Sequence, residues 1–188
     1  MSWPKILNRT TRRLSPWVKI IERSVEFRPQ SSPELYHALG QQDYVAILAM
    51  TPDGFIPIVR QYRPAVEGFT WELPAGMVDE NETPEACCRR ELAEETGLSA
   101  IALHALGSFH PCTARLSNRV HSFFVHTGPR AAALPAEPEL EIRFVKPDAL
   151  AELIAKGDFV LQLHIGALLL AGMGGHIDLG AFRLPPLA

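Results

Sequence analysis

The sequence predicts an α/β fold in which a mixed β-sheet carries helices on its faces. Short apolar runs bounded by turn residues have the composition of buried strands. Residues 84–96 carry helix start and stop signals, and residues 161–171 are rich enough in apolar side chains for a buried helix. The order of these segments, with strands first, then a helix, more strands and a final helix, is typical of a sheet covered by helices.

Residues 1–40 are predicted to form an N-terminal arm and a β-hairpin, separate from a second domain at residues 41–188. The first 19 residues contain five basic and no acidic side chains, which is typical of a solvated and partly mobile terminus. The segment 17–27 has the β-branched content of a strand. A turn that contains proline and serine leads from it into a second strand, which completes the hairpin.

The second domain begins with strands and tight turns that alternate along the chain. Residues 43–50 form a nearly continuous apolar run that ends in a Thr-Pro-Asp-Gly turn, and residues 55–62 complete a hairpin. Pro57 lacks a backbone N–H, so it indicates an edge or bulge position in the second strand of this hairpin. The further segments that we expect are strands at 69–73, 101–109, 120–126 and 140–145, a Pro- and Ala-rich loop at 128–138, and helices at 148–156 and 161–171.

Composition and charge exclude several classes of protein. The net charge of −3 gives no reason to expect nucleic-acid binding. The longest apolar run, from Phe159 to Met173, is interrupted by Gln162 and His164 and is too short to span a bilayer. Three cysteines make no disulfide framework, and the N-terminus lacks the apolar core of a secretory signal. We therefore expect a protein of the reduced cytoplasm that binds neither a membrane nor nucleic acid.

The segment from Gly76 to Leu98 concentrates carboxylates and arginines between two glycines. Thr83 and Pro84 form a helix start, with the threonine as N-cap and the proline in the first helical position. Gly97 forms the stop, because glycine enters the left-handed C-terminal cap without strain. The helix predicted between these signals carries the residues on which the functional argument depends.

Three glutamates of this helix, Glu91, Glu94 and Glu95, share one face because they are spaced i, i+3 and i+4. Like charges at such spacings destabilise a helix by roughly 0.2–0.5 kcal/mol per pair. A hard divalent cation relieves this repulsion, since Mg²⁺ is bound by carboxylates, waters and substrate phosphates. An isolated pattern of this kind is more typical of a solvated acidic helix face, so the surrounding residues decide between the two interpretations.

The whole segment matches the pattern G-x5-E-x7-R-E-U-x-E-E-x-G-U, in which U is aliphatic, at every fixed position. Average residue usage produces such a match by chance on the order of once in 10⁹ windows. The segment resembles the Nudix box, the signature of hydrolases that cleave a nucleoside diphosphate linked to another moiety. The resemblance implies a Nudix α/β/α sandwich with a mixed β-sheet.

The resemblance also implies roles for residues in and beside the box. Glu91, Glu94 and Glu95 are expected to bind Mg²⁺, or alternatively Mn²⁺, with the backbone carbonyl of Ala75 as a further ligand. Arg90 and Glu95 belong to the expected catalytic set, and Arg90 is expected to orient the glutamates by salt bridges rather than to touch substrate. Metal ions neutralise the bridging oxygens of a pyrophosphate and help to ionise the attacking water.

The residues that precede the box indicate which Nudix subfamily the chain resembles. The stretch from Gln61 to Gly76, QYRPAVEGFTWELPAG, resembles ADP-ribose and ADP-sugar pyrophosphatases, which carry Q-x-R and E-x-P-A-G there. Arg63 matches a substrate-binding arginine, and a guanidinium grips a phosphate with two parallel hydrogen bonds. Glu72 is expected to hold the ribose or the adenine side, although a strand glutamate that faces solvent fits the pattern equally.

Two loops are expected to complete the site. In the subfamily a catalytic glutamate lies before the last strand, and here Glu139 is the first choice, with Glu137 in reserve and Glu141 in the same acidic cluster. The spacing of this cluster differs from the expected pattern, and a plain acidic loop is the alternative. The loop after the box keeps a proline but lacks the Pro-Gly pair that ADP-ribose-cleaving relatives often show. Arg115 and Arg119 in this loop are candidate contacts for the terminal sugar or phosphate.

We therefore expect an Mg²⁺-dependent hydrolase that cleaves a nucleoside diphosphate sugar, with ADP-ribose as the first choice and AMP and ribose 5-phosphate as products. One alternative is another substrate of the superfamily, such as a GDP-sugar, a dinucleotide or a nucleoside triphosphate. The other is a catalytically silent nucleotide-binding module, against which the retained box glutamates speak. The likeness to the subfamily also implies that the N-terminal hairpin joins two copies into a homodimer.

Overall fold

The computed structural model describes residues 3–130 and 140–182, and the chain divides into two compact units. The first unit consists of Met1–Asp43 and Phe109–Val120, and the second consists of Tyr44–Ser108 and His121–Ala188. Each unit therefore combines segments that lie far apart in the sequence.

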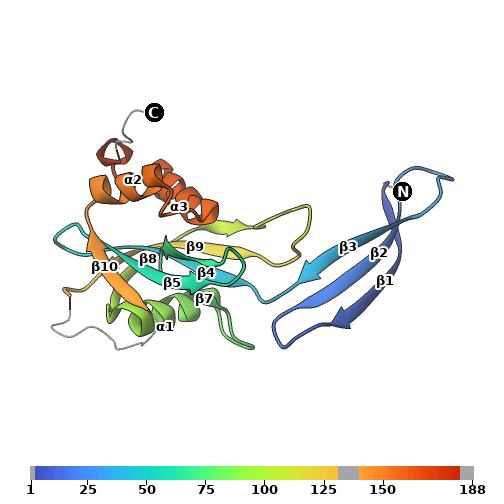
Figure 1. The fold of residues 1–188 in the computed structure, drawn as a ribbon, viewed down its shortest axis with the longest axis horizontal. Helices are drawn as coiled ribbons and strands as arrows, with labels where there is room; N and C mark the ends of the chain where they lie inside the picture. The colour runs from blue at the N-terminus through green and yellow to red at the C-terminus, as the bar shows by residue number, and fades with distance from the viewer. Residues whose placement is uncertain (1–2, 131–139, 183–188) are drawn as a thin grey trace. The chain divides into compact units, whose positions relative to one another are not determined.

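The first unit is built on an antiparallel sheet with the strand order β1-β2-β3 (Figure 1). Its strands are β1 (Lys5–Arg13), β2 (Lys19–Glu26) and β3 (Glu34–Gly40). Strands β2 and β3 form the expected hairpin. Residues 5–13 differ from the expected solvated and partly mobile terminus in their backbone, which pairs with β2 and adds a third strand. Their side chains are nearly all exposed, so no apolar alternation marks this strand in the sequence.

The segment 109–120 joins the first unit through β3. Leu39 forms an isolated parallel bridge with Leu116. The N–H of Leu39 donates to the carbonyl of Arg115 at 2.7 Å, and the N–H of Ser117 donates to the carbonyl of Leu39 at 3.0 Å. Because both backbone groups of Leu39 are used, this loop has a fixed register against the edge of the sheet.

The second unit contains two sheets, with the strand orders β10-β5-β6 and β7-β4-β9-β8. The strands are β4 (Tyr44–Met50), β5 (Ile56–Arg63), β6 (Gly68–Glu72), β7 (Ala75–Met77), β8 (Ala100–Phe109), β9 (Val120–Thr127) and β10 (Glu141–Val145). The helices are α1 (Pro84–Thr96), α2 (Pro147–Lys156) and α3 (Gln162–Met173), with a short 3₁₀ helix, η1 (Leu179–Ala181). Figure 1 shows α2 and α3 on one side of the sheets and α1 on the other, which confirms the predicted α/β sandwich.

Strand β4 explains why helices are needed on both sides of the sheet. Residues 45–49 are fully buried, which a strand achieves only when both of its faces are covered. Leu48 belongs to the core cluster that contains residues of α2 and α3. Ile47 belongs to a second cluster, together with Cys88 and Leu92 of α1. The continuous apolar run in the sequence is therefore the central layer of the sandwich.

Pro57 lies in the middle strand of its sheet, since β5 pairs with both β10 and β6. Pro57 itself is opposite Phe144 of β10, whereas the pairing with β6 begins only at Val59. The ladder therefore needs no hydrogen bond from Pro57 on the β6 side. The predicted edge position is correct for this end of β5 and wrong for the strand as a whole.

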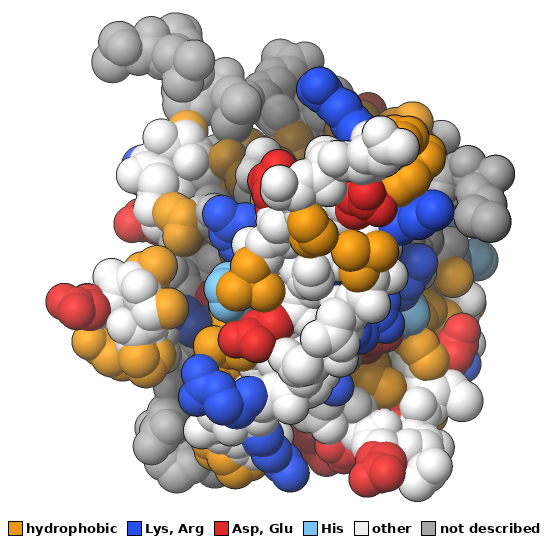
Figure 2. Space-filling view, turned by 90° about the vertical axis from the view of Figure 1, so that its right-hand side faces the viewer, with side chains coloured by type: hydrophobic (Ala, Val, Ile, Leu, Met, Phe, Trp, Pro, Cys, Tyr) orange, Lys and Arg blue, Asp and Glu red, His pale blue; other side chains and the backbone are white. Residues whose placement is uncertain are grey.

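The surface shows no sorting of charge on the face drawn in Figure 2, where acidic, basic and apolar side chains are interspersed. This distribution agrees with the small net charge of −3. Among the helices of residues 3–130 and 140–182, none is long and apolar enough to cross a membrane.

Candidate active site

Helix α1 carries most of the predicted metal-binding and catalytic residues, and its ends form as the sequence predicts. The Thr83 side chain accepts a hydrogen bond from the N–H of Ala86 at 3.2 Å, and Pro84 lies in the first turn. Gly97 has a φ of 69°, in the left-handed region, and its N–H donates to the carbonyl of Ala93 at 2.9 Å. These caps fix where the helix begins and ends.

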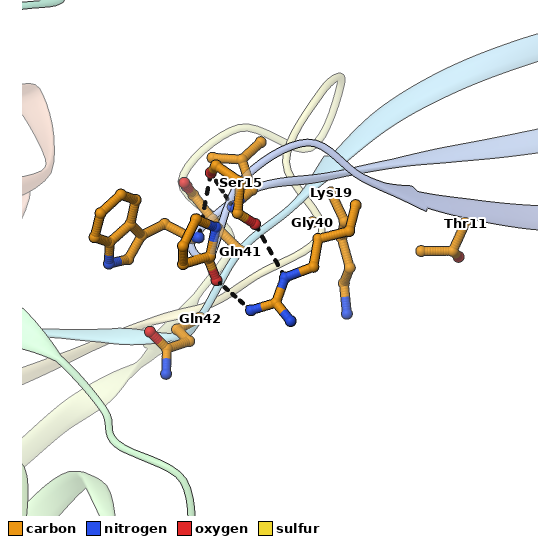
Figure 3. A pocket seen from close by; sticks show the side chains of 10 residues that line it. Thr11, Ser15, Lys19, Gly40, Gln41 and Gln42 are labelled. Carbon is orange, nitrogen blue, oxygen red and sulfur yellow. Dashed lines mark hydrogen bonds between the residues drawn. The ribbon is translucent and has the colours of Figure 1, made fainter.

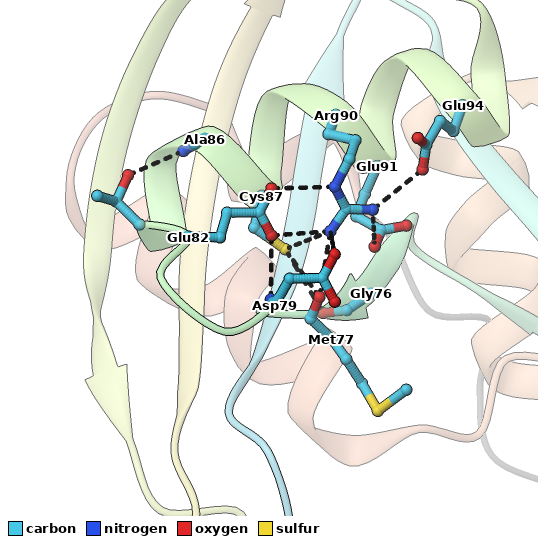
Figure 4. Close-up of polar contacts among 10 residues, drawn as sticks. Gly76, Met77, Asp79, Glu82, Ala86, Cys87, Arg90, Glu91 and Glu94 are labelled. Atoms are coloured by element: carbon cyan, nitrogen blue, oxygen red, sulfur yellow. Dashed lines mark hydrogen bonds and ion pairs between the residues drawn. The ribbon is translucent and has the colours of Figure 1, made fainter. Parts of the chain in front are cut away.

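Arg90 binds carboxylates from both α1 and the loop that precedes it, as Figure 4 shows. Its Nε and Nη2 atoms donate to the two carboxylate oxygens of Glu82 at 3.0 and 2.9 Å. Its Nη1 atom donates to Glu91 at 2.7 Å and to Glu94 at 3.0 Å. Nη2 also lies 3.9 Å from a carboxylate oxygen of Asp79. One guanidinium thus offsets part of the repulsion between the glutamates and fixes the orientation of their side chains.

These contacts determine how easily the carboxyl groups lose their protons. The hydrogen bonds from Arg90 lower the pKa of Glu82 to about 2. Burial raises the pKa of Glu91, and the ion pair with Arg90 opposes this rise without cancelling it. The Glu91 side chain is only 13% exposed, against 52% for Glu94. A further cation near Glu91 would therefore stabilise its ionised form.

Gly76 leaves the space that the Glu91 side chain occupies. A Cβ atom at residue 76 would lie 1.9 Å from the carboxyl carbon of Glu91, which no real contact allows. Strand β7 brings Gly76 to this place by pairing with β4, where Gly76 is opposite Val45. The first glycine of the motif is therefore a steric requirement for the position of Glu91.

Glu95 is turned toward strand β7 and is only 8% exposed. One of its carboxylate oxygens accepts a hydrogen bond from the N–H of Ala75 at 3.0 Å, so these two expected metal ligands are neighbours. Within the described parts of the chain, no three His, Cys, Asp or Glu side chains converge as they stand on a point that a metal ion could fill. The oxygen donors suit Mg²⁺ in kind, and in this arrangement Arg90 supplies positive charge to Glu91 and Glu94.

A second polar array lies on the hairpin of β5 and β6. The Nε and Nη2 atoms of Arg63 donate to the two carboxylate oxygens of Glu72 at 2.8 and 2.6 Å, and the Thr70 hydroxyl donates to Glu72 at 2.6 Å. The three residues share one face, since Thr70 is opposite Gln61 in the hairpin register. The Glu72 side chain is 4% exposed, so the alternative of a solvent-facing glutamate is wrong.

This array leaves Arg63 partly available. Burial acts to raise the pKa of Glu72, but the hydrogen bonds from Arg63 and Thr70 outweigh it and hold the pKa below its usual value. The Arg63 side chain is 41% exposed. Among the described residues its Nη1 atom has no hydrogen-bond partner. Glu72 therefore fixes the guanidinium plane of Arg63 while one donor group remains open to another acceptor.

His164 of α3 belongs to the same region, although the sequence marks it only as a polar interruption of an apolar run. It is fully buried, and its Nδ1 atom accepts a hydrogen bond from the N–H of Leu73, the residue after Glu72, at 3.0 Å. Burial lowers the pKa of His164 to about 4. Because Nδ1 is the acceptor, the proton is on Nε2, which has no hydrogen-bond partner among the described residues. This histidine ties the end of β6 to α3.

Two of the predicted substrate contacts, Arg115 and Arg119, belong to the first unit. The Nη1 atom of Arg115 donates to the hydroxyl of Tyr36 at 3.1 Å. The backbone N–H of Arg119 donates to a carboxylate oxygen of Asp43 at 2.7 Å. Both residues are exposed.

The two glutamates predicted as the general base, Glu139 and Glu137, lie outside the described residues. Glu141 of the same acidic cluster is described, at the start of β10. Its carboxylate forms ion pairs of 3.2 Å with Arg60 and with Arg143. These contacts make Glu141 part of the sheet surface.

Relatives of known name share parts of this sequence. The chain is 39% identical over 79 residues to the ADP-ribose pyrophosphatase of Bacillus subtilis (strain 168), a match that covers 42% of this chain and 43% of the relative. It is 32% identical over 130 residues to the ADP-ribose pyrophosphatase of Mycobacterium tuberculosis (strain ATCC 25618 / H37Rv), which covers 66% of this chain and 62% of that protein. The chain thus spans less than two thirds of the length of both relatives.

The fold is similar to a crystal structure of an ADP compounds hydrolase, with a TM-score of 0.77 over 94% of this chain and 98% of that chain. The sequence identity is 22%, so this likeness concerns the fold alone. A model of the NUDIX domain matches residues 40–162, which is more than half of the chain and includes the whole box from Gly76 to Leu98. The chain therefore belongs to the NUDIX domain family.

Proposed function

We propose that this chain is a metal-dependent pyrophosphohydrolase that hydrolyses ADP-ribose to AMP and ribose 5-phosphate. The observation that carries the proposal is the packing of α1 against β7, where the half-buried Glu91 carboxylate fits over Gly76 and is oriented by Arg90. Holding like charges close together lowers the stability of the fold, and such an arrangement is expected at a functional site. The choice of ADP-ribose is supported by the Q-x-R and E-x-P-A-G flanks and by the names of the two curated relatives.

In this proposal Glu91, Glu94, Glu95 and the carbonyl oxygen of Ala75 hold Mg²⁺, with Mn²⁺ as the alternative ion. When bound, the ion supplies positive charge to the bridging phosphate oxygens and lowers the pKa of water. Arg90 keeps the glutamates in position through contacts of 2.7 and 3.0 Å. Its own charge limits their mutual repulsion before substrate arrives.

The substrate is held by Arg63 in this proposal, through the Nη1 group that Glu72 leaves open. A guanidinium that is already fixed in its plane loses little conformational freedom when it binds a phosphate. Glu139, or Glu137 in its place, accepts a proton from the attacking water. Arg115 and Arg119 contact the terminal sugar or phosphate.

The proposal extends to assembly and location. We propose that residues 1–40 join two copies of the chain into a homodimer, which light scattering after size-exclusion chromatography tests directly. The place of action is the cytoplasm, where three unpaired cysteines remain reduced.

The test is release of AMP from ADP-ribose, with Mg²⁺ and with EDTA, by the wild type, Glu95→Gln and Glu85→Gln. Glu85 is a matched control because it lies on the same helix and is exposed. We expect AMP release that needs Mg²⁺, is lost by at least roughly a hundredfold in Glu95→Gln, and is unchanged in Glu85→Gln. Equal activity in all three proteins would refute the metal-binding role of α1.

Parallel reactions with GDP-mannose, UDP-glucose, dinucleotides and nucleoside triphosphates separate the proposal from its alternatives. Faster cleavage of one of these compounds would replace ADP-ribose as the substrate while leaving the reaction class intact. If ADP-ribose and all of these compounds stay uncleaved, a catalytically silent nucleotide-binding module becomes the better interpretation.

A further inference from the structure

A small cavity of about 270 Å³ lies within the first unit, lined by residues of the sheet and of the segment 109–120. Its polar side chains carry guanidinium, hydroxyl or imidazole groups. These are Arg23, Tyr36, His110, Thr113, Arg115 and Ser117. No carboxylate is among the described residues that line it. A cavity of this composition attracts an anion rather than a metal ion or an apolar group.

A row of three arginines leads across the sheet to this cavity. In the antiparallel register Arg9 of β1 is directly opposite Arg23 of β2, and Arg23 is directly opposite Tyr36 of β3. Residues paired in this way project from the same face of the sheet. Arg115 continues the row, because its Nη1 atom donates to the Tyr36 hydroxyl at 3.1 Å. The Tyr36 hydroxyl in turn donates to the carbonyl of Ala114, which fixes its position.

The charges in this row are not balanced by the sheet itself. Like charges directly opposite each other destabilise a pair of strands, and neither Arg9 nor Arg23 has an ion-pair partner among the described residues. Glu22 and Glu26 of β2 alternate with Arg23 and therefore project from the other face. On this face the described strands place one acidic residue, Glu34, two positions before Tyr36.

Arg13, on the same strand as Arg9, is an arginine whose donors are used within the unit itself, and it serves as a comparison for Arg23. Its Nε and Nη2 atoms donate to the carbonyls of Ser15 and Pro16 at 3.1 and 3.0 Å. Its donors therefore close the turn that contains Ser15, which Figure 3 labels. Arg23 makes no such contact with the described residues. Its guanidinium is available to a ligand in the cavity.

We propose that this cavity binds a phosphate monoester, gripped by Arg23 and Arg115, with Arg9 adding charge from the neighbouring strand. The planar fork of a guanidinium matches the oxygens of a phosphate, and two such forks surround its dianion. The volume of about 270 Å³ lies below the range of roughly 300–1,000 Å³ that drug-sized ligands occupy. The cavity therefore takes a phosphate with a small attached group rather than a whole nucleoside diphosphate sugar.

The same evidence speaks against a nucleic acid as the ligand. Acidic side chains are interspersed with basic ones on the face drawn in Figure 2, and the net charge of the chain is −3. A nucleic-acid backbone requires a stripe of positive charge along many phosphates. The cavity instead offers its positive charge at one place, and all of its lining residues belong to the first unit.

The test is calorimetric titration of the full chain in EDTA with inorganic phosphate and, separately, with ribose 5-phosphate. Ribose 5-phosphate is also the proposed product and Arg115 a proposed substrate contact, so Arg63→Gln, in the second unit, is one control. Binding that Arg63→Gln leaves unchanged is at the cavity and not at the proposed active site. We expect saturable binding that Arg23→Gln and Arg115→Gln each weaken roughly tenfold or more, as expected for the loss of a charge-assisted hydrogen bond. Arg12→Gln is the matched control, because Arg12 is opposite Ile20 and projects from the other face of the same sheet.

Each outcome decides for or against the cavity. Tighter binding of ribose 5-phosphate than of phosphate, or equal binding of both, supports the proposal and shows whether the attached group contributes. Absence of saturable binding for both ligands overturns it. Equal weakening by the Arg23, Arg115 and Arg12 variants also overturns it, because that result reflects the charge of the whole unit. Thermal melting of each variant verifies that the sheet is intact.

Discussion

Lowering the pH from 7 to 5 should destabilise the fold through His164. The side chain is fully buried, and its one hydrogen bond uses Nδ1 as an acceptor for the N–H of Leu73. A proton on Nδ1 would break this bond and place a charge in the core. The unfolded chain has no such restriction, so it binds the proton at a higher pH than the folded chain does.

The size of the effect follows from the two pKa values of this residue. The pKa is about 4 in the folded chain and 6.5 in the ordinary state of histidine, a difference worth roughly 3 kcal/mol when fully developed. Stability is therefore lost as the pH falls from 6.5 toward 4. About 2 kcal/mol of this loss falls between pH 7 and pH 5. Below pH 5 the carboxylates with lowered pKa, such as Glu72 and Glu82, begin to contribute in the same direction.

Urea unfolding at pH 7, 6 and 5 measures this loss, with His164→Asn as the control. The Asn side-chain oxygen can replace Nδ1 as the acceptor for Leu73, but it cannot bind a proton in this pH range. We expect the variant to be less stable at pH 7 and to lose about 2 kcal/mol less than the wild type on going to pH 5. Parallel pH dependences of the two proteins would refute the reasoning, since another group would then cause the loss.

Two further predictions concern the candidate site. Gly76→Ala should lower kcat/KM for ADP-ribose by roughly a hundredfold, because a Cβ atom 1.9 Å from the Glu91 carboxyl carbon must displace that side chain by about 1 Å or more; wild-type kinetics in a folded variant would contradict the steric account. Glu72→Gln keeps the volume of the side chain but removes the charge that fixes Arg63, so KM for ADP-ribose should rise roughly tenfold with a smaller change in kcat. An unchanged KM in steady-state kinetics would mean that Glu72 only packs.

The helix of the box could be predicted to the residue because each of its signals is local. The N-cap at Thr83, the proline after it and the left-handed Gly97 act within one turn of the backbone. The contact between Arg90 and Glu82 does not follow from local signals. It depends on how the loop after β7 returns to the helix, which no spacing in the sequence specifies.

The contact between Arg63 and Glu72 could be predicted only with the register of the β5–β6 hairpin in hand. Arg63 and Glu72 are separated by a turn whose length the sequence leaves open, and a slip of one residue would place them on opposite faces. His164 was open to prediction only as a polar residue in an apolar helix, and its partner Leu73 lies 91 residues away. The strand at residues 5–13 has exposed side chains, so its pairing could not be read from hydrophobicity.

The bridge between Leu39 and Leu116 has a consequence for how this chain can be dissected. The two segments of the first unit precede and follow Tyr44–Ser108, which belongs to the second unit. The backbone therefore passes between the two units more than once. A protease nick near residue 43 would leave the N-terminal fragment held by the hydrogen bonds of Leu39 to Arg115 and Ser117. Deleting residues 1–40 would likewise strip segment 109–120 of its backbone partners without removing it. The first unit is therefore not one contiguous piece of the chain, and removing residues 1–40 does not remove the whole unit.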